Sequence, residues 1–182
     1  YKILAEFSER PQIEIALDEV LALALPNGEP SGLRVRAFEV GRDVPRFVPE
    51  EADEAVGSVI GLQIEDTVTG GKLVYAPGVS SICDALRDAT EQSDGILIDG
   101  TFWTNDEPVR MGITNRTACQ MGHVPVSGST GTLEWLSQLS LRHRVYIHIN
   151  NTNPMLNEAG PEWQHVNQVG VHVGADGDEF KV

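Results

Sequence analysis

The stretch Gly95-Ile96-Leu97-Ile98, followed at once by Asp99, decides the fold that the sequence predicts. It is short, wholly apolar and bounded by acidic residues, which is typical of a strand buried on both faces of a sheet. A carboxylate placed directly after such a strand is costly to bury without a partner. Asp99 therefore needs a metal ion, a cation or backbone N–H donors. Two roles fit this pattern, a ligand or catalytic role and a cap on the loop Gly100–Phe102.

Strands and helices alternate around this stretch. The predicted elements are a hairpin of residues 59–66 and 72–77, a helix over 81–89 that opens with a Ser81/Asp84 capping box, the strand 95–98, a helix over 132–139, the strand 144–149, a helix over 161–170 and a strand over 171–173. In the strand 144–149, Tyr146 and His148 share one face. Residues before Gly71 predict a short helix followed by β-structure, with a loop over 42–54. We therefore expect one α/β domain over residues 1–182, with 95–98 and 144–149 as interior strands.

The composition excludes several classes of protein. Twenty-seven acidic and thirteen basic residues give a net charge of −14, which disfavours nucleic acid and anionic membrane surfaces as partners. No apolar run approaches the roughly 18–20 residues of a membrane-spanning helix. The two cysteines, Cys83 and Cys119, are too few for a disulfide scaffold, and the first ten residues are no signal peptide. These features predict a cytoplasmic protein, and the missing initiator Met is typical of a processed chain or a piece of a longer one.

Three polar side chains are predicted to meet at one edge of the sheet. Asp99 and His148 lie at the carboxyl ends of the two interior strands, where α/β proteins bind ligands, and His123 lies in the loop between them after Gly122. A carboxylate with imidazoles suits zinc or ferrous iron. Without H-x-H-x-D-H or HExxH, three ligands at most are present. His148 also fits a hydrogen-bonded core histidine, and His123 a general acid, a metal ligand or a loop residue.

Three motifs in order resemble one known family. They are LIDGTFW at 97–103, MGHVPVSG at 121–128 and HINNTNP at 148–154, and they resemble the pyrroloquinoline quinone (PQQ) biosynthesis protein B family from about Val59 to Phe180. This resemblance implies the metallo-β-lactamase fold, an αββα sandwich of two similar halves. The chain would then be the C-terminal half of that sandwich, and the missing N-terminal half of the same protein would be its partner. Half a sandwich would expose an apolar sheet face, which predicts a homodimer or aggregation of the isolated chain.

The resemblance also implies roles for individual residues. By analogy Asp99 and His148 are metal ligands, an Asp-His pair from the missing half completes the coordination, and His123 is a catalytic residue near the reacting group. The residues expected to bind substrate are Thr101, Phe102, Trp103, Asn150, Asn151 and Asn153. The superfamily often carries a further ligand histidine before the hairpin, but residues 46–58 contain none, which favours a single-metal site.

The resemblance implies a step in making the cofactor PQQ. The first expectation is an iron(II)-dependent hydroxylase acting on the tyrosine of a Glu–Tyr-derived precursor, a peptide-derived small molecule. One alternative is a metallo-hydrolase, with zinc as the alternative metal and a metal-bound hydroxide as nucleophile. The other alternative is a non-catalytic carrier of the quinone or its precursor to the periplasm.

Overall fold

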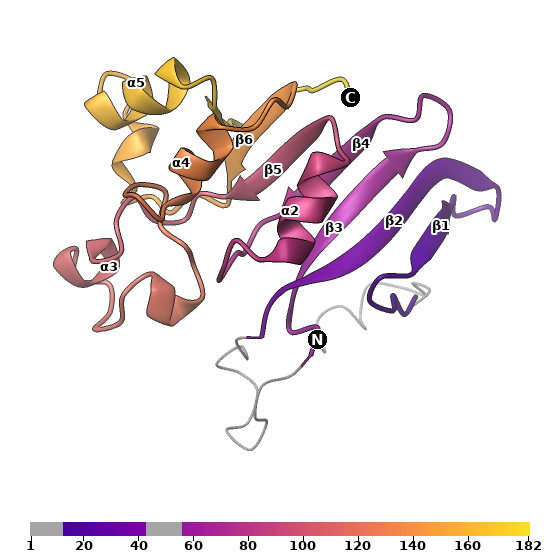
Figure 1. Cartoon of the computed structure of the whole chain (residues 1–182), viewed down its shortest axis with the longest axis horizontal. Coiled ribbons are helices and arrows are strands. Elements are labelled where there is room, and N and C mark those ends of the chain that lie inside the picture. The colour runs from indigo at the N-terminus through magenta and orange to yellow at the C-terminus, as the bar shows by residue number, and fades with distance from the viewer. Residues whose placement is uncertain (1–12, 43–55) are drawn as a thin grey trace.

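The computed structural model describes residues 13–42 and 56–182, and these form one mixed sheet with helices around it (Figure 1). The seven strands lie side by side in the order in which they occur in the chain. They are β1 (Val20–Ala24), β2 (Pro30–Gly41), β3 (Val59–Asp66), β4 (Lys72–Ala76), β5 (Gly95–Asp99), β6 (His143–Ile147) and β7 (His172–Val173). The α/β class that the sequence predicts is confirmed.

The direction of pairing changes at β4. From β1 to β4 each strand is antiparallel to its neighbour, and from β4 to β7 each strand is parallel to its neighbour. The antiparallel pairing of β3 with β4 confirms the predicted hairpin. Strand β5 lies between β4 and β6, and β6 lies between β5 and β7, so both predicted interior strands are confirmed. The register places Asp99 opposite Ile147, so the last residues of β5 and β6 lie at the same edge of the sheet.

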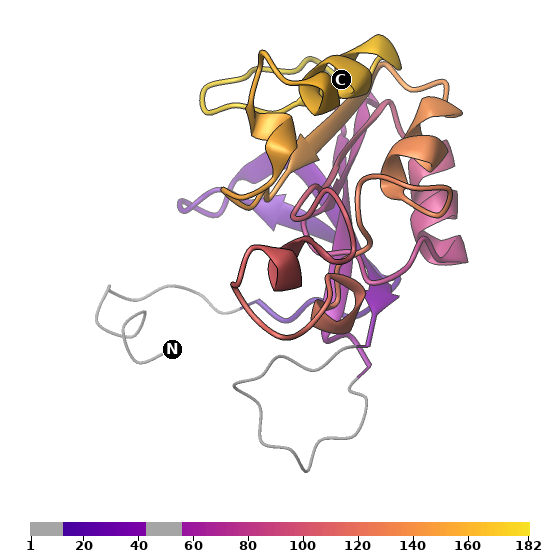
Figure 2. The same ribbon diagram turned by 90° about the vertical axis from the view of Figure 1, so that its left-hand side faces the viewer.

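The core lies between the sheet and the helices on one of its faces. The helices are α2 (Asp84–Glu91), α3 (Glu107–Arg110), α4 (Thr132–Ser137) and α5 (Pro161–Gln168), with two 3-10 turns, η1 (Cys119–Met121) and η2 (Pro154–Leu156). Figure 2 shows α2 and α4 on the same side of the sheet. Ile96 and Ile98 of β5 are fully buried there with Leu86 of α2 and Leu136 of α4. Burial of such side chains is the main term that stabilises the fold.

The opposite face of the sheet is also apolar. Side chains alternate between faces along each strand, so the register sets Leu62, Tyr75 and Leu97 side by side on this second face. Leu62 and Leu97 are only half-buried, and Tyr75 is exposed, as is Ile60 nearby. Contiguous exposed apolar surface of this kind marks an interaction site or an aggregation risk. We call the surface formed by these four residues the second sheet face.

Two predicted boundaries are wrong. Strand β6 ends at Ile147, and His148 has a φ of 54°, so it does not continue the strand on the face of Tyr146. Helix α2 begins at Asp84 with Cys83 as its N-cap and no side-chain cap, so the Ser81/Asp84 capping box does not form. The chain just before α2 is held elsewhere, because the Ser80 hydroxyl donates to the backbone of β2.

Other predictions lie partly outside the described residues. The expected β-structure before Gly71 is present as β1, β2 and β3, whereas the short helix predicted ahead of it would lie largely within residues 1–12, which are not described. The loop predicted over 42–54 lies almost entirely in residues 43–55, which are also outside the described part. Within the described ranges, no helix is long and apolar enough to cross a membrane.

The central strand provides a test of the core. Ile98→Ala removes a fully buried side chain from β5, and we expect the free energy of unfolding to fall by about 2–5 kcal/mol. Val68→Ala, in the exposed turn between β3 and β4, is the matched control and should change it by less than about 0.5 kcal/mol. Urea unfolding followed by circular dichroism measures both, and equal effects of the two changes would contradict this description of the core.

Candidate metal centre

The centre is built around the carboxylate of Asp99, which is 1% exposed at the end of β5. Its Oδ1 accepts hydrogen bonds from the backbone N–H of Thr101 at 3.0 Å and from the Thr101 hydroxyl at 2.5 Å. Its Oδ2 accepts from the Val79 N–H at 3.0 Å and from Nδ1 of His123 at 2.6 Å. These four donors use the roughly four lone-pair positions of a carboxylate. The loop-capping role that the sequence left open is therefore present in the structure.

Two histidines approach this carboxylate from different loops. His123 follows Gly122, whose φ of 85° turns the chain after η1. His148 follows β6, and its own positive φ of 54° is uncommon for a residue with a side chain and turns it back toward Asp99. The Nδ1 atom of His148 lies 3.7 Å from Oδ1 of Asp99. The two imidazole rings are stacked, with centroids 5.7 Å apart. The His123 side chain is 18% exposed and that of His148 54%.

The hydroxyl of Thr101 lies among all three side chains. It lies 2.5 Å from Oδ1 of Asp99, 2.9 Å from Nδ1 of His148 and 3.2 Å from Nδ1 of His123. The backbone oxygen of His148, at 3.0 Å, is a second and more distant acceptor for its single proton, which goes to the closer carboxylate; neither acceptor can donate, so Thr101 accepts from Nδ1–H of His148. Because Nδ1–H of His123 donates to Asp99, both histidines keep Nε2 as the nitrogen available to a metal or a substrate.

The charge of Asp99 controls the electrostatics of the centre. Burial alone raises the pKa of the Asp99 carboxyl, but its interactions with His123, His148 and Thr101 more than offset burial and hold that pKa at about 2. The same carboxylate raises the pKa of His148, against the opposing effect of partial burial. Asp99 is therefore an anion at neutral pH. The stabilisation that it gives to protonated His148 is lost as the pH rises through the raised pKa of His148.

The arrangement fits the chemistry of a divalent metal ion. Asp99, His123 and His148 each offer one ligand atom, and these atoms lie within 4.8 Å of one another. One carboxylate and two imidazoles form a donor set that zinc and non-haem iron(II) both accept. Since the lone pairs of Asp99 are already occupied, coordination through Asp99 requires Thr101 or His123 to give up its hydrogen bond. The structure thus brings the three predicted residues together, and their roles as ligands or catalyst remain predictions.

The predicted substrate-binding residues differ in burial and in their partners. Phe102 is buried, and its ring lies edge-on to that of His123 with centroids 6.1 Å apart. Trp103 and Asn150 are half-buried, and Asn151 is exposed. Asn153 is buried and uses its side chain within the fold, because Nδ2 donates to Gly100 O and Oδ1 accepts from Met155 N–H. Asn153 therefore joins the loops after β5 and β6.

Two residues organise these loops in ways that the sequence did not indicate. Thr101 was expected to bind substrate, yet its hydroxyl is used inside the centre. Glu107 was not expected to matter, yet it is buried and accepts hydrogen bonds from Trp103 and Thr152. A Glu in a polar loop carries no periodic signal, so the pattern offered no means of finding it.

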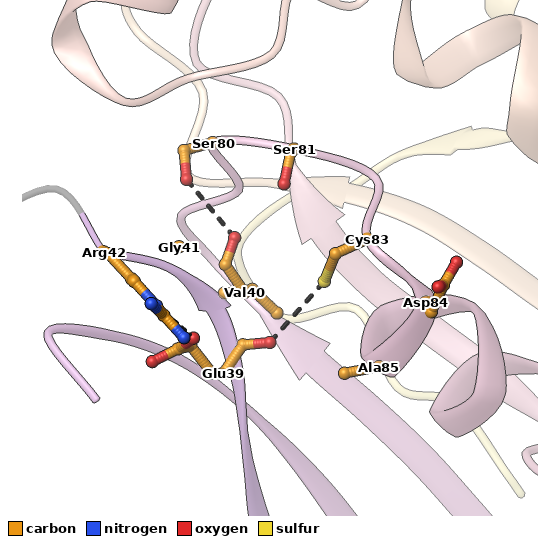
Figure 3. A pocket seen from close by; sticks show the side chains of 9 residues that line it. All are labelled: Glu39, Val40, Gly41, Arg42, Ser80, Ser81, Cys83, Asp84 and Ala85. Atoms are coloured by element: carbon orange, nitrogen blue, oxygen red, sulfur yellow. Dashed lines mark hydrogen bonds and ion pairs between the residues drawn. The ribbon is translucent and has the colours of Figure 1, made fainter. Parts of the chain in front are cut away.

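A separate cavity lies between β2 and the start of α2 (Figure 3). Its volume is about 590 Å³, and it contains none of the predicted site residues. The Cys83 thiol donates to the backbone oxygen of Glu39 at 3.5 Å, and the Glu39 carboxylate pairs with Arg42 at 2.8 Å. The cavity is therefore lined by groups that already bind one another.

Comparisons with known proteins identify relatives of this chain. The family model described as a β-lactamase superfamily domain matches residues 3–149. Coenzyme PQQ synthesis protein B of Gluconacetobacter diazotrophicus is 39% identical over 171 residues, which is 92% of this chain and 55% of that protein. The protein of the same name from Nitrosococcus oceani is 42% identical over 146 residues, 80% of this chain and 47% of that protein.

A solved structure gives the same result. The crystal structure of Zn²⁺-bound PqqB from Methylobacterium extorquens matches with a TM-score of 0.80 and 32% identity, covering 92% of this chain and 55% of that one. The chain thus spans about half the length of the curated relatives that it matches. The resemblance noted from the three motifs and the fold that it implied are confirmed.

The geometry of the centre predicts how His148 titrates. Asp99→Asn removes the charge that raises the pKa of His148, so that pKa should fall toward its ordinary value. NMR titration of the histidine ring protons in the presence of EDTA measures the change. Asp106→Asn, at an exposed position, is the matched control and should leave the His148 titration where it is. An unchanged pKa in Asp99→Asn would show that the carboxylate and this imidazole do not interact.

Proposed function

The chain belongs to the β-lactamase superfamily, and on that premise we propose that it forms part of a metal-dependent enzyme in the synthesis of coenzyme PQQ. The observation that carries the proposal is the cluster of Asp99, His123 and His148 at the carboxyl edge of the sheet. The names of the relatives indicate the pathway. The cluster is the reason to expect a catalysed reaction rather than transport of the product. A carrier does not need a buried carboxylate with two imidazoles beside it.

The proposed reaction is iron-dependent hydroxylation of the tyrosine in a Glu–Tyr-derived precursor. Two histidines and one carboxylate are the donor set of non-haem iron oxygenases, and Asp99 and His148 supply the carboxylate and one histidine of that set. Bound iron(II) supplies the redox chemistry by which one atom of dioxygen enters the ring and the other is reduced to water, with two electrons from a co-reductant. Asp99 and His148 hold the metal in this proposal, and His123 is placed to exchange a proton with the substrate through its Nε2.

Other side chains of the chain position the substrate in this proposal. The Thr101 hydroxyl forms hydrogen bonds with the side chains of Asp99 and His148 and so fixes their relative positions. Phe102 packs against the His123 ring in a T-shaped contact. Trp103 lies in the loop after β5 and Asn150 in the loop after β6. An aromatic side chain together with a polar wall suits a phenol, which has an apolar ring and a polar hydroxyl.

A zinc-dependent hydrolase is the second candidate, because the solved relative is described as Zn²⁺-bound. Asp99 and His148 also suit zinc, which lowers the pKa of bound water and makes it a nucleophile near neutral pH. In that reaction His123 acts as the acid that protonates the leaving group. Oxygen consumption separates the two candidates, because hydrolysis consumes none.

We further propose that the second sheet face packs against the rest of a longer protein. The relatives are about twice as long as the part that they share with this chain. The face presents Leu62, Tyr75 and Leu97 in adjacent strands, with Ile60 beside them. A metal site also needs more donors than two or three to bind tightly, and the remaining part is the proposed source of an Asp-His pair.

The second sheet face predicts self-association of the isolated chain. Without its proposed partner the chain should form dimers or larger species, which sedimentation velocity detects as a concentration-dependent shift. Tyr75→Lys places a charge in the middle of the face and should return the chain toward a monomer. Val68→Lys adds the same charge in an exposed turn away from the face and should not. A wild-type chain that stays monomeric at every concentration would contradict the proposed interface.

The metal centre predicts separable effects of three variants in the product of the complete gene. Asp99→Ala and His148→Ala should lower metal affinity by more than about 100-fold, because loss of a ligand exceeds the roughly 10–100-fold cost of losing an outer partner. His123→Ala should lower the turnover more than it lowers the metal content. Metal content is measured by mass spectrometry after equilibration with iron(II) or zinc, and turnover by an oxygen electrode with the Glu–Tyr-derived peptide.

An exposed histidine on α5 provides the control, since His165→Ala should leave both readouts unchanged. Equal loss of metal in all three variants would make His123 a ligand instead of a catalyst. Full metal content in Asp99→Ala or His148→Ala would overturn the proposed site. Product formation without oxygen consumption would favour the hydrolase, and ligand binding without turnover would favour the carrier.

A further inference from the structure

Glu107 is a buried acidic residue that joins the two loops flanking the centre. It is 1% exposed and begins α3, in the long segment that follows β5. Its Oε2 accepts the backbone N–H of Trp103 at 2.6 Å, and its Oε1 accepts the hydroxyl of Thr152 at 2.7 Å. The ion pairs among the described residues do not include Glu107. Short hydrogen bonds are typical of an ionised carboxylate that accepts at both oxygens.

The hydrogen bond from Thr152 fixes the direction of the next one. A threonine hydroxyl has a single proton, and Thr152 gives it to Glu107. Toward Asn150 the Thr152 oxygen can then only accept, and Nδ2 of Asn150 donates to it at 2.5 Å. The amide of Asn150 is thereby oriented with its nitrogen toward Thr152 and its carbonyl oxygen turned away. Asn150 is anchored beside the centre, because its backbone N–H donates to the oxygen of Thr101 at 3.1 Å.

We infer that Glu107 is a positioning residue that acts through Thr152 to make Asn150 present its carbonyl oxygen, so that the substrate group facing Asn150 is a hydrogen-bond donor. The statement about substrate rests on the proposed function, in which Asn150 belongs to the wall of the substrate pocket. The statement about the amide orientation rests only on the hydrogen bonds of Glu107, Thr152 and Asn150. A hydroxyl or an N–H group meets this requirement, and an ether oxygen does not.

A one-atom change reverses this chain of hydrogen bonds. In Glu107→Gln the side-chain oxygen must face the Trp103 N–H, which can only donate, so the new NH₂ group faces Thr152. Thr152 then accepts from residue 107, and its own proton turns toward Asn150. The Asn150 amide responds by turning its oxygen toward Thr152 and its nitrogen away. Shape and volume stay nearly constant while the presented atom changes from an acceptor to a donor.

Nuclear magnetic resonance of the full chain labelled with ¹⁵N tests this directly, with EDTA present so that no metal is involved. In the wild type, one proton of the Asn150 side-chain amide should be shifted downfield and exchange slowly because it is bonded to Thr152. In Glu107→Gln that proton should lose its downfield shift and its slow exchange. Asn150→Asp removes the signals and so assigns them. An unchanged Asn150 amide in folded Glu107→Gln would overturn the inference.

Thr152 offers a second route if Glu107→Gln does not fold. Thr152→Val removes the hydroxyl that accepts from Asn150 and should abolish the slow exchange of the Asn150 amide proton, whereas Thr152→Ser keeps the hydroxyl and should preserve it. Slow exchange that persists in Thr152→Val would contradict the inference. Because these readouts need neither metal nor turnover, their failure is distinct from failure of the proposed enzyme.

A rescue experiment tests the direction of the hydrogen bonds. In the wild-type background, Asn150→Asp places a carboxylate, which can only accept, next to the Thr152 oxygen, which also only accepts on that side. The hydrogen bond is lost, so the urea midpoint should fall. In Glu107→Gln the new carboxylate can accept the proton of Thr152, so the same change should restore the midpoint. Asn151→Asp, at the exposed neighbouring position, adds the same charge and should show no such dependence on residue 107. If Asn150→Asp and Asn151→Asp depend on residue 107 to the same extent in their urea midpoints, charge repulsion alone explains the effect and the inference is overturned.

The ligand preference is tested with phenol, which carries a donor, and anisole, which presents only an acceptor. Phenol should perturb the Asn150 amide signals of the wild-type chain more than anisole does at equal millimolar concentration. In Glu107→Gln this preference should disappear. Equal perturbation by the two probes in the wild type, or none by either, would contradict the statement about substrate.

Discussion

Burial of the negative charge of Asp99 at the end of the central strand is the constraint on which the rest of the site depends. An ionised carboxylate is stable there only with several donors around it. The donors come from three places in the chain: Val79 after β4, Thr101 in the next loop, and His123 from the far end of a long polar segment. One charge therefore joins three segments of the chain through hydrogen bonds. His148 joins them from the fourth segment, through the hydroxyl of Thr101.

The sequence predicted the parts of this arrangement that follow from periodicity and from topology. Both interior strands and the meeting of Asp99 with His148 at one edge follow from short apolar runs in a parallel sheet. The local backbone at that edge could not be predicted, because His148 adopts a positive φ, which is uncommon for residues other than glycine and has no periodic signal in the sequence. Glu107 was missed for a related reason. Its importance lies in hydrogen bonds from the nearby Trp103 N–H and from Thr152, which is distant in the sequence, and no local pattern predicts the second contact.

The chain holds three candidate metal-binding residues, and the proposal takes further donors from the rest of a longer protein. The three candidate ligands, the positioning network of Glu107 and the aromatic contact of Phe102 with His123 all lie within this chain. The second sheet face is apolar and partly exposed, and the relatives are about twice as long as the shared part. In the proposal, the rest of a longer protein packs on the second sheet face and supplies the Asp-His pair that completes the metal coordination. His148 is more than half exposed, which leaves a side open from which additional donors could reach a metal.

The central claim is that Asp99 and His148 bind a metal ion. Anomalous X-ray diffraction tests it most directly, with crystals of the complete gene product loaded with iron(II) or zinc and data collected at the absorption edge of each metal. The account predicts one peak within about 2–2.5 Å of an Asp99 carboxylate oxygen and of a His148 nitrogen. The carboxylate should also have lost its hydrogen bond to Thr101 or to His123. A metal peak elsewhere, with Asp99 still holding all four of its hydrogen bonds, would contradict the claim.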